Sequence, residues 1–289
     1  MEQDVVSYAF GLVTFVDILG FRSLIETADA PTIARAVRHL QRFSSSRDLY
    51  GQHFSAPADP IVRAIAFSDS VVRVRLFGRE PSADTIMLEL RDMVVAQCEM
   101  VREGIFVRGG ISAGEIYLDE TDGNVLFGPA LVRAYELESK YAIQPRIVID
   151  PDLVDALYRR VEAEDSALRN ADDYYDGVDS HLLIEDLKEF TSQLPNDLLQ
   201  LDYLWAWRHL LDEEADWADF LRQHKRMILS NLALATLAMN ASVKAKMTWL
   251  KGYHNRTIRF LIHHADKEGY RSSYDVVNYR FYLKQFLIR

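Results

Sequence analysis

The stretch that most constrains the fold is the apolar run from Phe10 to Leu24, FGLVTFVDILGFRSL. Its β-branched and aromatic residues predict a buried strand that ends on the carboxylate of Asp17, before a short turn and a helical pattern. Burying a carboxylate costs several kcal/mol unless a cation or hydrogen-bond donors offset it. A carboxylate between a core strand and a helix suits a metal ion and a phosphate side by side, although a helix cap or turn Asp is the alternative.

The composition is that of a globular protein, with 49% hydrophobic and 26% charged residues among 289. A net charge of −10 argues against non-specific nucleic-acid binding, which needs basic surface. The single cysteine, Cys98, excludes an internal disulfide and is typical of a reducing compartment. We expect a cytoplasmic protein, because the N-terminus lacks a signal-peptide pattern. The most apolar later run, residues 227–243, is too short and too polar for a membrane span and predicts a buried helix.

The order of the predicted elements indicates the fold class. Over residues 10–150 the patterns read strand, helix, hairpin, helix, strand, helix, strand. This order predicts an α+β fold of the ferredoxin-like kind with a mostly antiparallel sheet. Because helical patterns rich in Trp and Leu follow, we expect an α+β domain over residues 1–197 and a helical extension over residues 198–289 that stabilises a dimer.

A second carboxylate, Asp69, lies at the predicted tip of the hairpin formed by IVRAIAF and VVRVRLF. An antiparallel sheet can bring this tip beside the end of the strand that carries Asp17. Two acids at one sheet edge are what a two-metal phosphoryl-transfer site requires. For Asp69 alone, an ordinary turn residue is the alternative.

A candidate cation, Arg108, lies in the segment FVRGGISAG. A strand arginine flanked by glycines gives a fixed positive charge where a ligand can approach the backbone closely. An ion pair with a surface acid is the alternative.

Four segments together resemble the class III nucleotide cyclases, in the order and spacing of that family. FVDILGF is similar to the opening strand and metal-binding turn, and IAFSDSVV to the second metal-binding hairpin. VRGGISAGEIY is similar to the strand whose arginine, here Arg108, grips the terminal phosphates, and LFGPALVRAYELES to the dimer-site helix. The resemblance implies a cyclase catalytic domain over residues 1–197, a nucleoside triphosphate substrate and a homodimer with composite sites.

The same resemblance assigns the metal and phosphate ligands. Asp17 and Asp69, assisted by the carbonyl of Ile18, would hold two divalent ions, Mg²⁺ or Mn²⁺, in each site. The backbone amides of Gly20 and Phe21 would bind phosphates.

The departures from the family pattern are informative. Purine cyclases carry an Asn and, four residues later, an Arg in the dimer-site helix, where this chain has Val132 and Glu136. Their purine-reading Lys and Asp correspond here to Ile65 and Val125. The segments GPALVRAYELES and, near the C-terminus, WLKGYHN resemble the Pycsar anti-phage cyclases, which make cyclic CMP or cyclic UMP. Arg133, next to the Asn position, is the candidate for replacing the missing Arg.

The choice of base follows from the same positions. Ile65 and Val125 would leave the polar edge of a purine unpaired, which is costly. Arg73 and Arg133 would supply donors near the site and favour the O4 acceptor of uracil, so we expect UTP to be converted to 3′,5′-cyclic UMP and pyrophosphate. CTP and cyclic CMP are the alternative. Tyr50, in the loop before the hairpin, is a candidate for stacking on the base.

Two further functions compete with this prediction. One is a degenerate cyclase fold that acts as a nucleotide-binding regulatory module, which the retention of Asp17, Asp69 and Arg108 argues against. The other is a purine cyclase with an unusual pocket, which the apolar residues at the base-reading positions disfavour. The resemblance also implies a separate effector protein that senses the cyclic nucleotide, and phage infection as the trigger.

Overall fold

The computed structural model describes residues 7–42, 62–77, 83–119, 125–159, 187–265 and 273–289. Tyr50, the candidate stacking residue, lies outside the described residues. The chain divides into two compact units, Met1–Ala206 and Trp207–Arg289. Among the described helices, none is long and apolar enough to cross a membrane.

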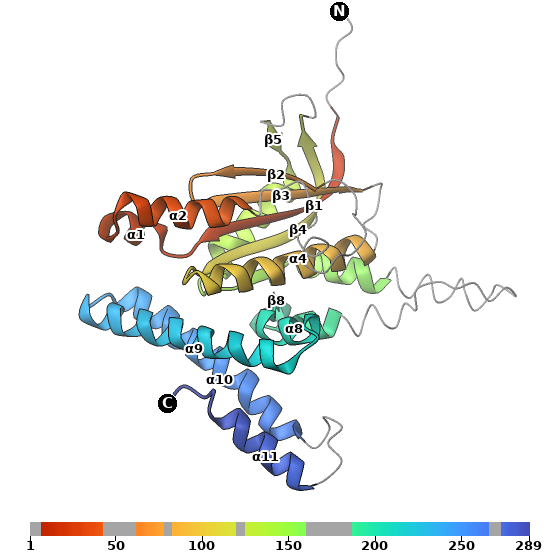
Figure 1. The fold of residues 1–289 in the computed structure, drawn as a ribbon. Helices are drawn as coiled ribbons and strands as arrows, with labels where there is room; N and C mark the ends of the chain where they lie inside the picture. Colours follow the sequence, from red (N-terminus) through yellow and green to blue (C-terminus); the bar gives the residue numbers. More distant parts are fainter. Residues whose placement is uncertain (1–6, 43–61, 78–82, 120–124, 160–186, 266–272) are drawn as a thin grey trace, which may run out of the picture. The chain divides into compact units, whose positions relative to one another are not determined.

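The first unit is built on one sheet, with strand order β2-β3-β1-β4-β6-β8-β7 and with β5 paired to β4 (Figure 1). The strands are β1 (Ala9–Ile18), β2 (Val62–Phe67), β3 (Ser70–Phe77), β4 (Val107–Leu118), β5 (Leu126–Phe127), β6 (Ile147–Ile149), β7 (Thr191–Gln193) and β8 (Leu199–Leu201). Of the described strand pairs, only β4 and β6 run parallel. The predicted α+β class with a mostly antiparallel sheet is confirmed.

Helices cover both faces of this sheet. They are α1 (Phe21–Thr27), α2 (Ala30–Gln41), α4 (Ala83–Arg102), α5 (Pro129–Glu136), the π-turn η2 (Leu137–Tyr141), the short 3₁₀ turn η3 (Pro195–Asp197) and the start of α8 (Tyr203–Leu210). On one face, Leu40 of α2 and Met93 of α4 pack near Val16 of β1. On the other face, α5 packs on Val13 and Phe15. This division follows from the alternation of side chains along β1.

The central strand β1 fixes the register of the site. It pairs antiparallel with β3 and β4, and Asp17 lies opposite Ser70 on one side and Arg108 on the other. Because side chains alternate between faces, a one-residue slip would move every side chain of β1 to the opposite face and would turn Asp17 away from α5, so the packing of both faces specifies this register. The three polar residues therefore lie side by side on the α5 face.

The two arginines of β3 lie on the opposite face, buried against α4. Arg73 and Arg75 have side chains at most 1% exposed. Arg73 Nε lies 3.0 Å from Glu89 Oε1, Arg75 Nη2 lies 2.7 Å from Asp92 Oδ2, and Arg73 also pairs with Asp92. The prediction that Arg73 supplies a donor near the nucleotide is wrong, because strand alternation points it away from Asp17 and two acids of α4 neutralise it.

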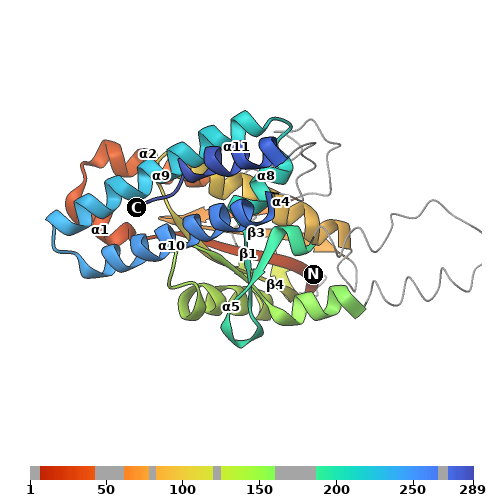
Figure 2. The ribbon, with the colours of Figure 1, turned by 90° about the horizontal axis from the view of Figure 1, so that it is seen from below.

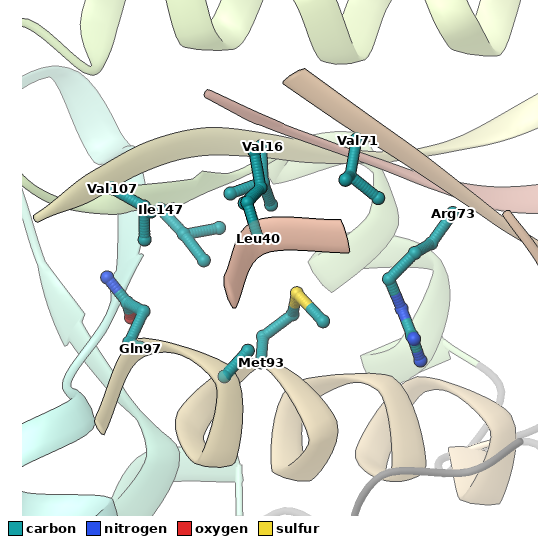
Figure 3. A pocket seen from close by; sticks show the side chains of 9 residues that line it. Val16, Leu40, Val71, Arg73, Met93, Gln97, Val107 and Ile147 are labelled. Atoms are coloured by element: carbon teal, nitrogen blue, oxygen red, sulfur yellow. The ribbon is translucent and has the colours of Figure 1, made fainter. Parts of the chain in front are cut away.

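A void of about 10 Å³ lies between the sheet and α4 (Figure 3). Its lining includes Val16, Met93 and Gln97. The void is far too small to hold a nucleotide.

The second unit contains the end of α8 together with α9 (Glu214–Leu237), α10 (Ala241–His264) and α11 (Ser273–Lys284). The helix α10 packs against both α9 and α11 (Figure 2). In its core, His224 Nδ1 lies 2.9 Å from His254 Nδ1, and His254 Nε2 lies 3.0 Å from the Phe286 carbonyl oxygen. Asn255 makes two hydrogen bonds of 2.8 Å with the backbone of Ile288, so α10 holds the C-terminal segment.

The apolar run 227–243 is not a buried helix. It spans the end of α9, a turn and the start of α10. Leu234, Leu237 and Met239 are 64%, 81% and 90% exposed. The prediction of a buried helix is wrong, because α9 ends at Leu237, the residues after it form an exposed turn, and Asn240 caps a new helix near the end of the run.

The first unit extends beyond the boundary expected from the sequence. Residues 199–201 form β8, which pairs with β6 and β7. They therefore belong to the sheet, and not to a helical extension that begins at residue 198. A strand of three residues is too short to give a periodic signal between helical patterns.

Candidate active site

Asp17 lies at the end of β1 with donors on both sides. Ser70 Oγ donates to Asp17 Oδ1 at 3.1 Å. Arg108 donates to Asp17 Oδ2 through Nη2 at 3.2 Å and Nε at 3.3 Å. The side chain of Asp17 is 15% exposed, so it is largely withdrawn from solvent but reachable from one side.

Asp69 lies beside Asp17 at the tip of the β2–β3 hairpin. The loop consists of Ser68 and Asp69, and Ser68 adopts a positive φ of 55°. The Ile18 amide donates to the backbone oxygen of Asp69 at 3.0 Å, which ties the hairpin tip to the end of β1. Burial, and then the neighbouring Asp69 carboxyl, raise the pKa of Asp17 to about 7. The structure thus brings together the two acids singled out in the sequence.

Two neighbouring carboxyl groups favour a shared proton or a bound cation. Mg²⁺ and Mn²⁺ prefer oxygen ligands, and Mg²⁺ is commonly held by one or two carboxylates together with substrate phosphates. Asp17, Asp69 and the carbonyl of Ile18 fit such an ion. The described residues contain no cluster of three or more His, Cys, Asp or Glu side chains that could hold a metal, so further ligands would come from substrate or water.

A third carboxylate, Glu138, reaches the site from η2. Its Oε1 lies 2.7 Å from Arg108 Nε, and the residue is 2% exposed. Burial raises the pKa of the Glu138 carboxyl, although Arg108 opposes this shift. The close approach of α5 and η2 depends on Gly110, since a Cβ there would lie 2.2 Å from the Ala134 carbonyl oxygen. Gly110 therefore allows Glu138 to reach Arg108.

Ser70 and Glu138 were missed from the sequence. Ser70 can be placed across from Asp17 only when the strand register is known. Glu138 did leave a signal, because it follows Ala134 by four residues and falls on the buried stripe of the helix. A charged residue on a core-facing stripe indicates a buried partner.

The turn after β1 lies at the same end of the sheet as Asp17. Gly20 caps α1 with a φ of 79°, which glycine adopts without steric cost, and is exposed. Phe21 begins α1 and buries its side chain. These positions put the first amides of α1 within the same region as the carboxylates.

Arg133 does not join this group within one chain. Its Nε and Nη2 donate to the carboxylate of Asp150 at 2.9 and 3.0 Å. Asp150 also accepts a hydrogen bond of 3.1 Å from Ser112, which lies four residues beyond Arg108 on β4. Because four strand residues correspond to about 13 Å, Ser112 lies about 13 Å from Arg108 along β4, and the ion pair with Asp150 holds Arg133 at that position.

The two predicted base-reading positions lie at opposite ends of the first unit. Ile65 pairs with Val72 near the hairpin tip, at the Asp17 end. Val125 precedes β5, which pairs with Leu118 at the far end of β4. Ten strand residues separate Leu118 from Arg108, roughly 30 Å. One chain therefore brings Ile65, but not Val125, close to the acids.

No family model and no curated protein sequence matches the chain. Among solved structures, it is similar to the monomeric guanylyl cyclase domain of the RhoGC fusion protein from the aquatic fungus Blastocladiella emersonii, with 15% identity, 67% of this chain and 95% of that chain covered, and a TM-score of 0.43. It is also similar to the catalytic core of a rhodopsin-guanylyl cyclase with converted specificity, in complex with ATPαS. The identity is 18%, 52% of this chain and 82% of that chain are covered, and the TM-score is 0.40. A bacterial light-regulated adenylyl cyclase matches with 12% identity and a TM-score of 0.38, with 75% of this chain and 99% of that chain covered. Likeness at this level assigns neither activity nor substrate to the chain.

Proposed function

We propose that the chain is a nucleotide cyclase that converts a nucleoside triphosphate to a 3′,5′-cyclic nucleotide and pyrophosphate. The observation that carries the proposal is the convergence of Asp17 and Asp69 at one end of the sheet, where the Asp69 carboxyl helps to raise the pKa of Asp17, beside the guanidinium of Arg108. Two neighbouring acids that are partly withdrawn from solvent weaken a fold unless they bind a proton or a cation. Two acids and an arginine at one sheet edge match the needs of phosphoryl transfer.

In this mechanism the residues of the chain bind and orient the substrate. Asp17, Asp69 and the Ile18 carbonyl would hold the divalent ions, Mg²⁺ or Mn²⁺, which supply Lewis acidity for the ribose 3′-hydroxyl and the phosphates. Arg108 would donate to phosphate oxygens, as would the amides of Gly20 and Phe21. The 3′-oxygen forms a bond to the α-phosphorus, the bond from that phosphorus to the bridging oxygen breaks, pyrophosphate leaves, and the hydroxyl proton passes to water.

The proposed substrate is a pyrimidine nucleoside triphosphate. Ile65 lies at the acid end of the sheet and offers no polar group to a purine edge, and Val125 is equally apolar. An unpaired purine edge group costs about 1–3 kcal/mol, so two such losses discriminate strongly against ATP and GTP. The burial of Arg73 removes one donor invoked for uracil, and Arg133 is held by Asp150. The positions of these two arginines therefore favour neither pyrimidine, and both UTP, the substrate expected from the sequence, and CTP are proposed substrates.

The proposed active form is a homodimer with composite sites. Val132 is 59% exposed and Tyr135 is 53% exposed on α5, and Val125, which precedes β5, and Phe127 of β5 are also exposed. A two-fold axis would place this apolar surface of each protomer against its partner, and could bring Val125 of one chain to the acids of the other. A role in anti-phage signalling through a separate effector, as in the Pycsar cyclases, belongs to the same proposal.

One observation favours a second candidate, a nucleotide-binding regulatory module without turnover. Val132 and Glu136 stand at the positions of the family Asn and Arg, and Arg133 is engaged by Asp150. Such a module would bind the triphosphate without releasing pyrophosphate.

Pyrophosphate release separates the two candidates. We expect the chain with Mn²⁺ and mixed nucleoside triphosphates to release pyrophosphate, and Asp17→Asn or Asp69→Asn to lower the rate at least about a hundredfold. Glu99→Gln, which removes a carboxylate from a surface ion pair with Arg102, is the matched control and should keep the rate. Circular dichroism checks that each variant is folded. Near-normal turnover by either Asp variant would contradict the two-metal assignment.

A further inference from the structure

One guanidinium, that of Arg108, serves two carboxylates. It donates to Asp17 Oδ2 through two nitrogens, at 3.2 and 3.3 Å, and its Nε lies 2.7 Å from Glu138 Oε1. Asp17 approaches from β1 and Glu138 from η2, and both lie close to the Nε of the arginine. The shorter distance is to the more deeply buried acid, whose side chain is 3% exposed.

The contact with Glu138 is close but not aligned as a hydrogen bond. The Nε–H group of Arg108 is directed to Asp17, and among the residues that the structure describes none hydrogen-bonds Glu138 Oε1. A buried carboxylate oxygen without a donor is costly. Glu138 can therefore accept a hydrogen bond from Arg108 as soon as Asp17 releases it.

The proposed function supplies a cause for such a release. A divalent ion bound to Asp17 Oδ2 and a guanidinium bound to the same oxygen would repel each other at close range. An ion that binds this oxygen therefore favours displacement of Arg108 from Asp17. Without another acid nearby, the displaced side chain would be free to leave the site.

We propose that Glu138 is a positioning residue that takes Arg108 from Asp17 when a divalent ion binds, and holds the guanidinium facing the phosphates. This inference rests on the proposed function of the same site. In the metal-free chain Arg108 occupies Asp17 as a substitute cation. In the metal-bound chain the same arginine is held by Glu138 through Nε, and its terminal nitrogens become available to the substrate.

Binding of Mn²⁺ alone, without nucleotide, tests the proposal. Free Mn²⁺ is measured by its electron paramagnetic resonance signal during titration of the full chain. Because Glu138 stabilises the released position of Arg108, Glu138→Gln should weaken Mn²⁺ binding about five- to tenfold, the size of a coupled pair. Arg108→Gln removes the competitor and should tighten binding. In the Arg108→Gln background, Glu138→Gln should have no further effect.

Controls separate this role from structural and direct electrostatic roles. Glu99→Gln should bind Mn²⁺ like the wild type. Glu138→Asp, which keeps the charge but shortens the side chain, serves if Glu138→Gln does not fold, and should also weaken binding. Equal Mn²⁺ affinity of Glu138→Gln and wild type would overturn the proposal. An equal loss in the Arg108→Gln background would also overturn it, since Glu138 would then act on the ion directly. If Asp17→Asn binds Mn²⁺ like the wild type, the two-metal function fails and the inference fails with it.

Discussion

The pKa of Asp17 links the site to the stability of the folded chain. Burial, and then the Asp69 carboxyl, raise it from 3.8 to about 7. Between these values the folded chain binds a proton that the unfolded chain does not. The stabilising contribution of this group is therefore complete at low pH and is lost as the pH rises through about 7. Above that pH the charged carboxylate opposes folding unless a cation is bound.

The first prediction concerns Asp17→Asn without divalent ions. At pH 8 we expect the variant to be more stable than the wild type, on the order of 2 kcal/mol, because the buried charge is gone. At pH 5 the difference should shrink. Thermal unfolding at the two pH values measures it, and Mn²⁺ should raise the midpoint of the wild type but not that of the variant. A variant less stable than the wild type at pH 8 would contradict this account of Asp17.

At the scale of the elements, the approach of α5 and η2 to β4 depends on one glycine. A Cβ on Gly110 would lie 2.2 Å from the Ala134 carbonyl oxygen and 2.6 Å from Leu137 Cβ. Neither atom belongs to a flexible side-chain end. A methyl group at this position must therefore shift the helix that carries Glu138.

The second prediction is that Gly110→Ala loses about 1–3 kcal/mol of stability, the usual cost of overpacking, and loses activity. The matched control is Gly252→Ala in α10, where nothing lies within 4 Å of the added Cβ. At that position the same change should leave the free energy of unfolding unchanged or raise it by about 0.5–1 kcal/mol. Urea unfolding measures both, and a Gly110→Ala protein as stable as the wild type would show that the helix does not depend on this contact.

The buried histidine pair gives the helical unit its own pH dependence. Burial lowers the pKa of His254 to about 4 and also lowers that of His224. The charged groups acting on the pair include Lys225, which also lowers the pKa of His254. Both rings stay neutral in the fold, whereas the unfolded chain protonates them near pH 6.5. Their stabilising contribution is therefore lost as the pH falls from about 6.5 towards 4.

The third prediction compares His254→Gln with the wild type. Glutamine can still donate to the Phe286 carbonyl but does not titrate, so the stability difference between the proteins should depend on pH. The wild type should lose up to about 3 kcal/mol relative to the variant between pH 7 and pH 4.5. Urea unfolding at the two pH values gives the difference. A difference independent of pH would show that His254 does not titrate as described.

The elements differ in how far the sequence predicts them. The long apolar β1 and the carboxylate at its end are predictable, because burial over eight to ten residues leaves a strong pattern. The three-residue β8 is not, since it has no period to detect. Arg73 and Arg75 follow an alternation typical of a solvent-facing strand side, and only the acids Glu89 and Asp92 on α4 explain why that side is buried.

The acids and the arginine of the candidate site could be singled out from the sequence, whereas the residues around them could not. Asp17 and Arg108 stand out because charged residues in apolar strands are costly, and Asp69 stands out because it lies at the tip of a hairpin that can reach Asp17. Ser70 and Glu138 depend on strand register and on the π-turn η2, which local patterns do not specify. The long distance between Arg108 and Val125 follows from the pairing of β5 with the far end of β4, which local sequence patterns do not specify.

At the scale of the whole molecule, the separation of Val125 from Asp17 bears on assembly. Our fourth prediction is a homodimer in light scattering. Val132→Glu, which puts a charge on the exposed apolar surface of α5, should give an inactive monomer. Leu237→Glu on α9 tests separately whether the exposed end of that helix contributes to the dimer interface. An active monomer of either the wild type or Val132→Glu would contradict the composite site.

The most direct test of the central claim is the product itself. The purified chain is incubated with Mn²⁺ and equal amounts of ATP, GTP, CTP and UTP, and the products are identified by mass spectrometry. We predict one 3′,5′-cyclic pyrimidine nucleotide, cyclic UMP or cyclic CMP, with an equal amount of pyrophosphate, and neither product from Asp17→Asn. Cyclic AMP or cyclic GMP as the main product would contradict the apolar base pocket. The absence of any cyclic nucleotide would contradict the proposal that the chain is a nucleotide cyclase.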